Sequence, residues 1–211
     1  MTIRRGAAHA WGPRGNVRLT AATGLVLVGV LAVEALTTLS LHRYLPLHIF
    51  LGFVVLPAVS LKLASTGWRF ARYYAGSNPY RLAGPPRLGF RLFAPLLVVS
   101  TVALFGSGVA LVVMGHGGGL LLTVHAASFA VWGVLMIVHI AGYLARALRV
   151  GTADWRSRAA RIVPGASFRR ALLVGALLAG VIVALATYPA QQAFHRGAGA
   201  DGVRRQAGRG A

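Results

Sequence analysis

The chain has 211 residues, of which 56% are hydrophobic and only 12% are charged, and its formal net charge is +19. This composition excludes an ordinary soluble domain and is typical of an integral membrane protein. The lack of cysteine excludes disulfides, thiolate zinc sites, iron–sulfur clusters and covalently attached c-type haem. The arginines stand between apolar segments, so we interpret them as topology determinants that meet anionic lipid headgroups, and not as a nucleic-acid surface.

Apolar runs long enough to cross a bilayer predict five transmembrane helices. In chain order they cover residues 19–41, 46–65, 92–114, 120–146 and 171–188. Long arginine-rich loops follow the second and fourth spans, and short turns follow the first and third. The expected fold is an all-α membrane bundle over residues 19–188, with disordered basic tails at 1–18 and 189–211.

The basic residues are distributed unequally between the two sides of this predicted bundle. The N-terminal tail and the two long loops carry most arginines on one side, and the opposite turns carry only Arg43, besides the C-terminal tail. The positive-inside rule therefore predicts a cytoplasmic N-terminus. With an arginine- and alanine-rich composition, this predicts a multi-pass protein of a bacterial plasma membrane.

The fourth span carries two histidines, His125 and His139, within an apolar run. Their separation of fourteen residues puts both rings on one helix face, ~21 Å apart along the axis. Imidazoles in hydrocarbon are costly and usually have a function or a buried partner. A histidine pair at this interval is the arrangement by which transmembrane b-type cytochromes hold haem iron.

The second span places His48 at the same outer level as His125. The two imidazoles are therefore expected to supply both axial nitrogens of one haem b, a site that favours electron transfer over oxygen chemistry. Gly52, one turn below His48, would leave room for the porphyrin. His42 and His116 lie in outer turns and are either alternative ligands to His48 or ordinary loop histidines.

At the inner level the position opposite His139 is occupied by Lys62 instead of a second histidine. A lysine there must reach the interface with its ammonium or be held by a partner. A second haem is therefore doubtful. His139 remains a candidate lone iron ligand, a propionate or quinone contact, or a histidine bonded to a neighbouring helix.

Glu34 is the only acidic residue within a predicted span, close in depth to His125. A carboxyl group at that depth is expected to be protonated or hydrogen-bonded. It could accept the Nδ1–H of a haem-ligating histidine or pass protons toward a quinone. The structural alternative is a carboxyl bonded to a nearby hydroxyl such as Thr37 or Thr38.

The segments LHIFLGFVVLPAVSLKLASTGWRFARYY and LLTVHAASFAVWGVLMIVHIAGYL, with a basic GPP loop between them, carry a family resemblance. Over residues 41–146 the chain resembles the membrane cytochrome b subunits of prokaryotic respiratory enzymes. Within that group it is most similar to actinobacterial membrane modules related to molybdopterin oxidoreductases. The resemblance implies haem b and electron transfer between a quinone pool and a partner redox protein, with His48, His125 and His139 at matching positions.

Two other classes stay open. The sequence contains no nucleotide-binding or hydrolase motif, so the chain is at most the electron-transfer subunit of an oxidoreductase. A haem-free transporter could use Glu34, Lys62 and His139 as an ion path. In a haem-free assembly or scaffold protein, the histidines would only hydrogen-bond across helices. A bound chromophore distinguishes the cytochrome from both.

Overall fold

The computed structural model describes residues 12–84, 88–115 and 119–207, which are helical and contain no strand. Five helices are long and apolar enough to cross a membrane, so the predicted all-α, multi-pass bundle is confirmed. These are α2 (Pro13–Thr38), α3 (Leu41–Tyr74), α5 (Leu88–Met114), α6 (Leu120–Gly151) and α8 (Ala166–Ala186). Shorter or more polar helices connect or follow them: α4 (Asn78–Leu82), η1 (Ala153–Trp155), α7 (Ser157–Ile162) and α9 (Tyr188–Ala207).

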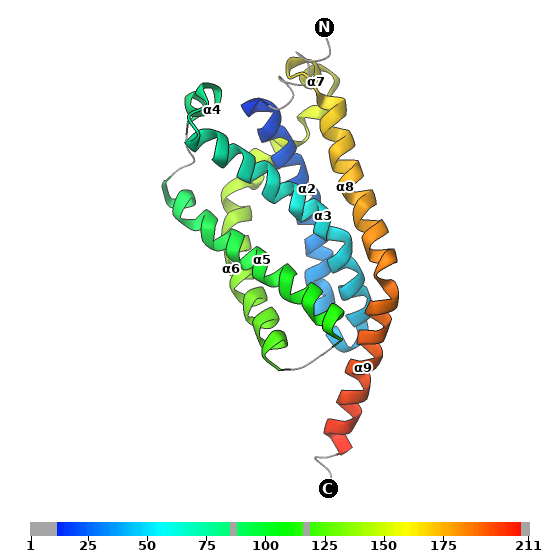
Figure 1. Ribbon diagram of the computed structural model, residues 1–211. Coiled ribbons are helices and arrows are strands. Elements are labelled where there is room, and N and C mark those ends of the chain that lie inside the picture. Colours follow the sequence, from blue (N-terminus) through cyan, green and yellow to red (C-terminus); the bar gives the residue numbers. More distant parts are fainter. Residues whose placement is uncertain (1–11, 85–87, 116–118, 208–211) are drawn as a thin grey trace.

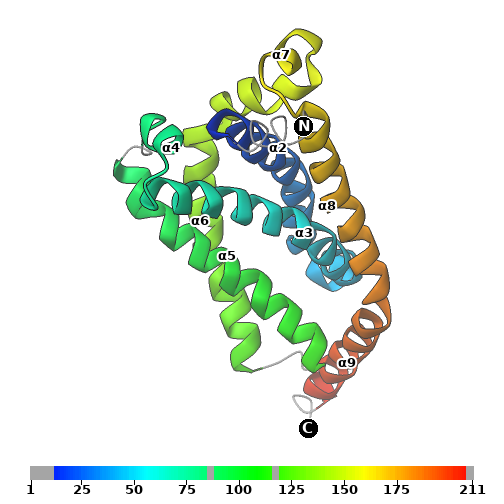
Figure 2. The same cartoon turned by 45° about the horizontal axis from the view of Figure 1, so that its top comes forward.

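The spans form two packed groups (Figures 1 and 2). In one group, helix α3 lies between α2 and α8, and in the other, α5 packs against α6. The two groups meet mainly where α2 packs on α6, because the contact between α3 and α5 is small. Gly180 of α8 lies against the Val54 backbone of α3, where no side chain would fit. Gly151 of α6 similarly meets the Ala21 backbone of α2. Small residues at such crossings let membrane helices approach closely.

The buried core is built largely from α3. One cluster joins Ile49 and Phe53 to Leu111 of α5, and a second joins Val55 and Ala58 to α2. Many large apolar side chains on the outer faces remain exposed, as expected for lipid-facing surface. Helix α6, which carries two histidines, is the least buried of the five spans.

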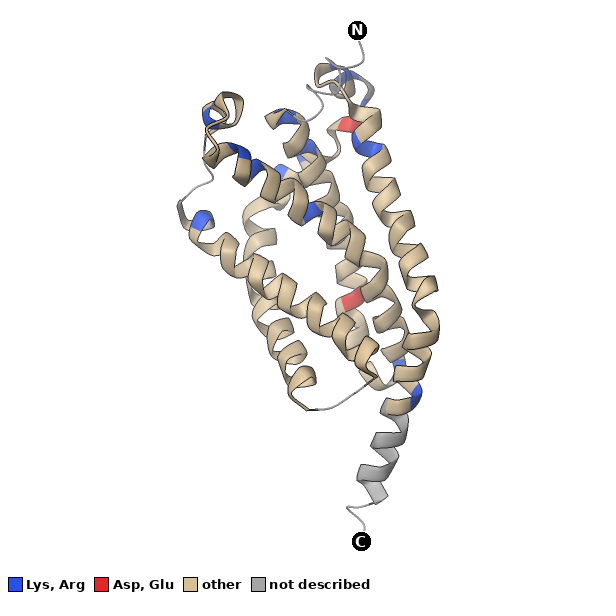
Figure 3. Cartoon of the chain, viewed as in Figure 1, with Lys and Arg blue, Asp and Glu red and all other residues tan. Residues whose placement is uncertain are grey.

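Most of the basic residues, nearly all of them arginine, lie at one end of the bundle, which we call the basic end (Figure 3). There Asp154, only 3% exposed, joins α2 and α8 to the segment after α6. Its Oδ1 accepts from Arg18 Nη1 at 2.9 Å and Arg169 Nη2 at 2.7 Å, and its Oδ2 accepts from Arg169 Nε at 2.5 Å. The positive-inside rule predicts that this end is cytoplasmic.

The first helix begins earlier than the sequence predicts. Helix α2 starts at Pro13, so residues 13–18 are helical where a disordered tail was expected. Long-range contacts explain the difference: Asn16 Nδ2 donates to the Ser65 carbonyl at 2.8 Å, and Arg18 pairs with Asp154. These partners lie far away in sequence, so local composition does not reveal them.

The predicted loop after the second span and the predicted C-terminal tail also differ from the structure. Helix α3 continues to Tyr74, and α9 follows α8 where a disordered tail was expected. Gln191 and Phe194 of α9 are buried, and Gln191 Nε2 donates to the Ala184 carbonyl at 2.8 Å. Residues 1–11, 85–87, 116–118 and 208–211, including His116, lie outside the described residues.

Candidate functional site

His48 of α3 and His125 of α6 lie next to each other in the membrane part of the bundle. Their ring centroids are 6.4 Å apart and the ring planes are inclined by 80°. Metal–imidazole bonds are about 2.0–2.1 Å long, so the centres of two imidazoles on opposite sides of one metal ion lie roughly 6 Å apart. The observed centroid distance therefore matches that of two imidazoles that share one metal ion.

The hydrogen bonds around His48 define its tautomer. Its Nδ1 lies 3.0 Å from both Thr37 Oγ1 and Glu34 Oε1. The Thr37 hydroxyl donates its only hydrogen to the Glu34 backbone carbonyl at 2.5 Å, so it can only accept from the ring. With Glu34 as a carboxylate, which can only accept, Nδ1 of His48 carries the hydrogen and Nε2 of the neutral ring has the lone pair.

The same reasoning holds for His125. Its Nδ1 lies 3.1 Å from the Leu104 carbonyl, which can only accept, and 3.1 Å from Ser107 Oγ. The Ser107 hydroxyl itself has backbone acceptors, Ala103 O at 2.6 Å and Leu104 O at 3.0 Å. Nδ1 of His125 is therefore also a donor, and Nε2 of the neutral ring has the lone pair.

Both histidines thus have the form of a metal ligand, with one ring nitrogen oriented by the protein and the other able to coordinate. Among the described residues neither Nε2 has a hydrogen-bond partner. Within the same ranges, no group of three or more His, Cys, Asp and Glu residues could hold a bare metal ion. Haem brings four nitrogens of its own and needs only two axial ligands from the protein, so the pair fits haem better than a bare ion.

Glu34 lies behind His48, where it fixes the ring. Its carboxyl is largely buried, and Oε1 lies 3.0 Å from His48 Nδ1, a contact with a histidine that the depth of Glu34 predicts. Oε2 is fully buried and has no hydrogen-bond partner among the described residues. Gly52 faces the same carboxyl, because a Cβ there would lie 3.7 Å from Glu34 Oε1. A side chain at position 52 would therefore contact the Glu34 carboxyl.

Helix α5 contributes residues that the sequence analysis does not single out. Ser107 and the Leu104 carbonyl orient His125, and a Cβ on Gly108 would lie only 3.1 Å from His125 Cε1. Gly108 is therefore the glycine that makes room for this imidazole. In the sequence, the run Gly106–Ser107–Gly108 inside an apolar span could have indicated this close contact between α5 and α6, since small residues allow helices to approach each other.

The inner level has a different chemistry. Lys62 Nζ donates to the Thr20 carbonyl of α2 at 2.6 Å. It occupies the space left by Gly24, where a Cβ would lie 2.7 Å from the ammonium. The lysine is thus held by a partner helix. The His139 ring contacts the Tyr143 ring, with centroids 5.0 Å apart and planes tilted by 39°, and lies within electrostatic range of Lys62. No second imidazole faces His139 in the described part of the chain.

The remaining candidate ligand, His42, is exposed at the start of α3. The structure therefore brings together His48, His125, Glu34 and Gly52, and it leaves His139 and His42 apart from them. Comparison of the chain with protein-family models, with curated proteins and with solved structures found no match.

Proposed function

We propose that this chain is a b-type cytochrome of the membrane, in which His48 and His125 hold one haem. The observation that supports the proposal most strongly is the pair of neighbouring imidazoles, with centroids 6.4 Å apart and each with Nδ1 hydrogen-bonded to the protein. A haem held there would supply one-electron redox chemistry. The resemblance to cytochrome b subunits implies that this haem would pass electrons between a quinone pool and a partner redox protein. The partner class that the resemblance favours is a molybdopterin oxidoreductase.

The protein's own contribution is to hold and orient the two rings. Glu34 and Thr37 fix His48, and the Leu104 carbonyl and Ser107 fix His125. Acceptors at Nδ1–H raise the basicity of the opposite nitrogen and keep the ring in one orientation. These acceptors lie on α2 and α5, and the two histidines lie on α3 and α6, so four helices position the two proposed ligands.

A haem-free ion path is the rival function, and the contacts of its candidate residues disfavour it. Glu34 binds His48, whereas Lys62 binds the Thr20 carbonyl, and Glu34 and Thr20 are separated by ~21 Å along α2. The two ionisable groups thus have separate local partners. A path between them would require a further chain of polar groups.

The test is a dithionite-reduced minus air-oxidised visible spectrum of the purified full-length protein, together with its haem-to-protein ratio. A host that supplies haem amply should yield a sharp reduced α-band of the b type and about one haem per chain. A protein that folds in the membrane and binds no haem would contradict the proposal. Two haems per chain would contradict the assignment of a single site.

A further inference from the structure

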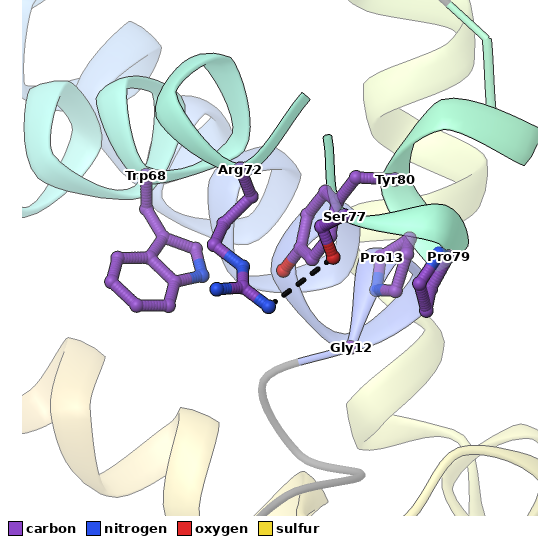
Figure 4. Close-up of a pocket in the computed structure, with 7 residues that line it drawn as sticks. All are labelled: Gly12, Pro13, Trp68, Arg72, Ser77, Pro79 and Tyr80. Atoms are coloured by element: carbon purple, nitrogen blue, oxygen red, sulfur yellow. Dashed lines mark hydrogen bonds between the residues drawn. The ribbon is translucent and has the colours of Figure 1, made fainter. Parts of the chain in front are cut away.

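A cavity of about 280 Å³ lies at the basic end, between the start of α2, the last turns of α3 and α4 (Figure 4). Its walls include Trp68, Arg72, Ser77 and Tyr80, with Pro13 and Pro79 beside them. Arg72 and His48 are separated by twenty-four residues of α3, or ~36 Å. The cavity is therefore distinct from the candidate haem site.

Arg72 gives this cavity a cation whose donors are largely unused by the residues that the structure describes. Its Nη2 donates to Ser77 Oγ at 3.2 Å, and its guanidinium carbon lies 5.7 Å from the centroid of the Trp68 ring. In the described part of the chain Arg72 makes no ion pair. A guanidinium has five N–H donors arranged as a fork, so most remain available for a ligand. That fork matches the oxygens of a phosphate group.

The aromatic residues of the cavity indicate its depth relative to the membrane. Tyr80 is 5% exposed and Trp68 is 47% exposed, and both line the cavity beside Arg72 (Figure 4). Tryptophan and tyrosine are enriched at the headgroup level of membranes, because their rings are apolar at one end and polar at the other. A cavity with such walls is expected at the lipid headgroup level of the basic end.

The charge and the size of the cavity point to one class of ligand. Neither acidic side chain that the structure describes, Glu34 or Asp154, lines the cavity, so its anion must come from outside these residues. The volume lies just below the ~300–1,000 Å³ typical of small-molecule sites. It accommodates a phosphate-bearing headgroup while the acyl chains remain in the bilayer.

We propose that this cavity binds the headgroup phosphate of an anionic membrane phospholipid. Arg72 donates to the phosphate oxygens, Trp68 covers the guanidinium, and Ser77 holds it toward the cavity. Basic pockets between transmembrane helices on the cytoplasmic side are suited to such headgroups. The proposal does not depend on haem, since no residue of the cavity contacts His48 or His125.

The test is native mass spectrometry of the full-length protein in detergent, titrated separately with phosphatidylglycerol, phosphatidylcholine and sodium phosphate. The wild-type protein should bind one phosphatidylglycerol more tightly than phosphatidylcholine. Arg72→Gln should weaken the phosphatidylglycerol affinity about tenfold, as expected when a charged hydrogen bond is lost. Arg72→Lys, which keeps the charge without the fork, should give a smaller loss.

Arg170→Gln is the matched control, because Arg170 is exposed on α8 at the same end and does not line the cavity. It should leave the phosphatidylglycerol affinity unchanged, and the melting temperature of each variant checks its folding. Equal affinity of wild type and Arg72→Gln would overturn the proposal. Equal binding of phosphatidylcholine, or displacement of phosphatidylglycerol by millimolar phosphate, would overturn the assignment to an anionic lipid.

Discussion

The two acidic side chains that the structure describes differ in how fully their oxygens are satisfied. Both oxygens of Asp154 accept hydrogen bonds from arginine, and this cluster joins α2, α8 and the segment after α6. Glu34 has one oxygen at His48 and one buried oxygen without a partner in the described residues. The Asp154 cluster, in which both carboxyl oxygens accept hydrogen bonds, stabilises the packing of the helices. The Glu34 carboxyl, which has one oxygen without a partner in the described residues and lies beside His48, is suited to a ligand site.

Breaking the Asp154 cluster should have the largest effect on the protein. Asp154→Ala leaves Arg18 and the 3%-exposed Arg169 without their carboxylate. Removing one partner of a buried ion pair costs about 3–5 kcal/mol, so we expect a large fall in melting temperature and in the yield of folded protein. Thermal unfolding in detergent measures this effect, with Arg170→Gln as the control. A melting temperature equal to that of the wild type would show that the cluster is not a structural clamp.

Removing a proposed ligand should leave the fold intact and abolish the cofactor. His48→Ala and His125→Ala each remove one of the two proposed iron ligands, and we expect either variant to lose the stoichiometric haem. His139→Ala is the matched control, since it removes an imidazole from α6 without touching the proposed site. Haem per folded chain, from the absorbance of the denatured cofactor, is the measurement. Loss of haem in the His139 variant alone would mean that the haem binds at the inner level, at His139, and not at His48 and His125.

Changing the group behind the ligand should have an intermediate effect. Glu34→Gln keeps the shape of the side chain and weakens the acceptor at His48 Nδ1, and loss of such partners typically costs 10–100-fold in metal affinity. We expect a weaker haem affinity by that order in a titration of the haem-free protein. Thr38→Ala is the control, because the Thr38 hydroxyl donates only to the Ala35 carbonyl at 2.6 Å. Equal affinities of wild type and Glu34→Gln would exclude this positioning role.

The smallest effect is expected at Lys62. Lys62→Met removes a buried ammonium held by one carbonyl and replaces it with an apolar chain of similar length. The desolvation cost of the buried ammonium offsets the loss of its one hydrogen bond, so the unfolding free energy should change by no more than about 1 kcal/mol. The haem-to-protein ratio should stay at that of the wild type. A fall in that ratio would mean that the inner level takes part in cofactor binding.

The sequence predicts the class of fold and the neighbouring histidines for clear physical reasons. Apolar length defines the spans, and helical periodicity with alternating direction brings His48 and His125 to one level. The depth of Glu34 likewise suggests its contact with a histidine. These features depend on regular helix geometry, which can be read from local sequence.

What the sequence could not predict depends on contacts between distant residues. The support of His125 by Ser107 and Gly108, and the position of Lys62 against Gly24, follow from how α5 and α2 rotate about their axes. The Asp154 cluster links residues more than a hundred positions apart. The helical N-terminus at Pro13 depends on the same kind of tertiary contact through Asn16.

The most direct test of the central claim, that His48 and His125 bind one iron, is the electron paramagnetic resonance spectrum of the oxidised protein. We predict a low-spin ferric signal with two imidazole ligands, of the strongly anisotropic type expected for axial rings inclined by 80°. Any haem that His48→Ala or His125→Ala retains should not show this signal. A high-spin signal in the wild type, or the same low-spin signal in either variant, would contradict the account.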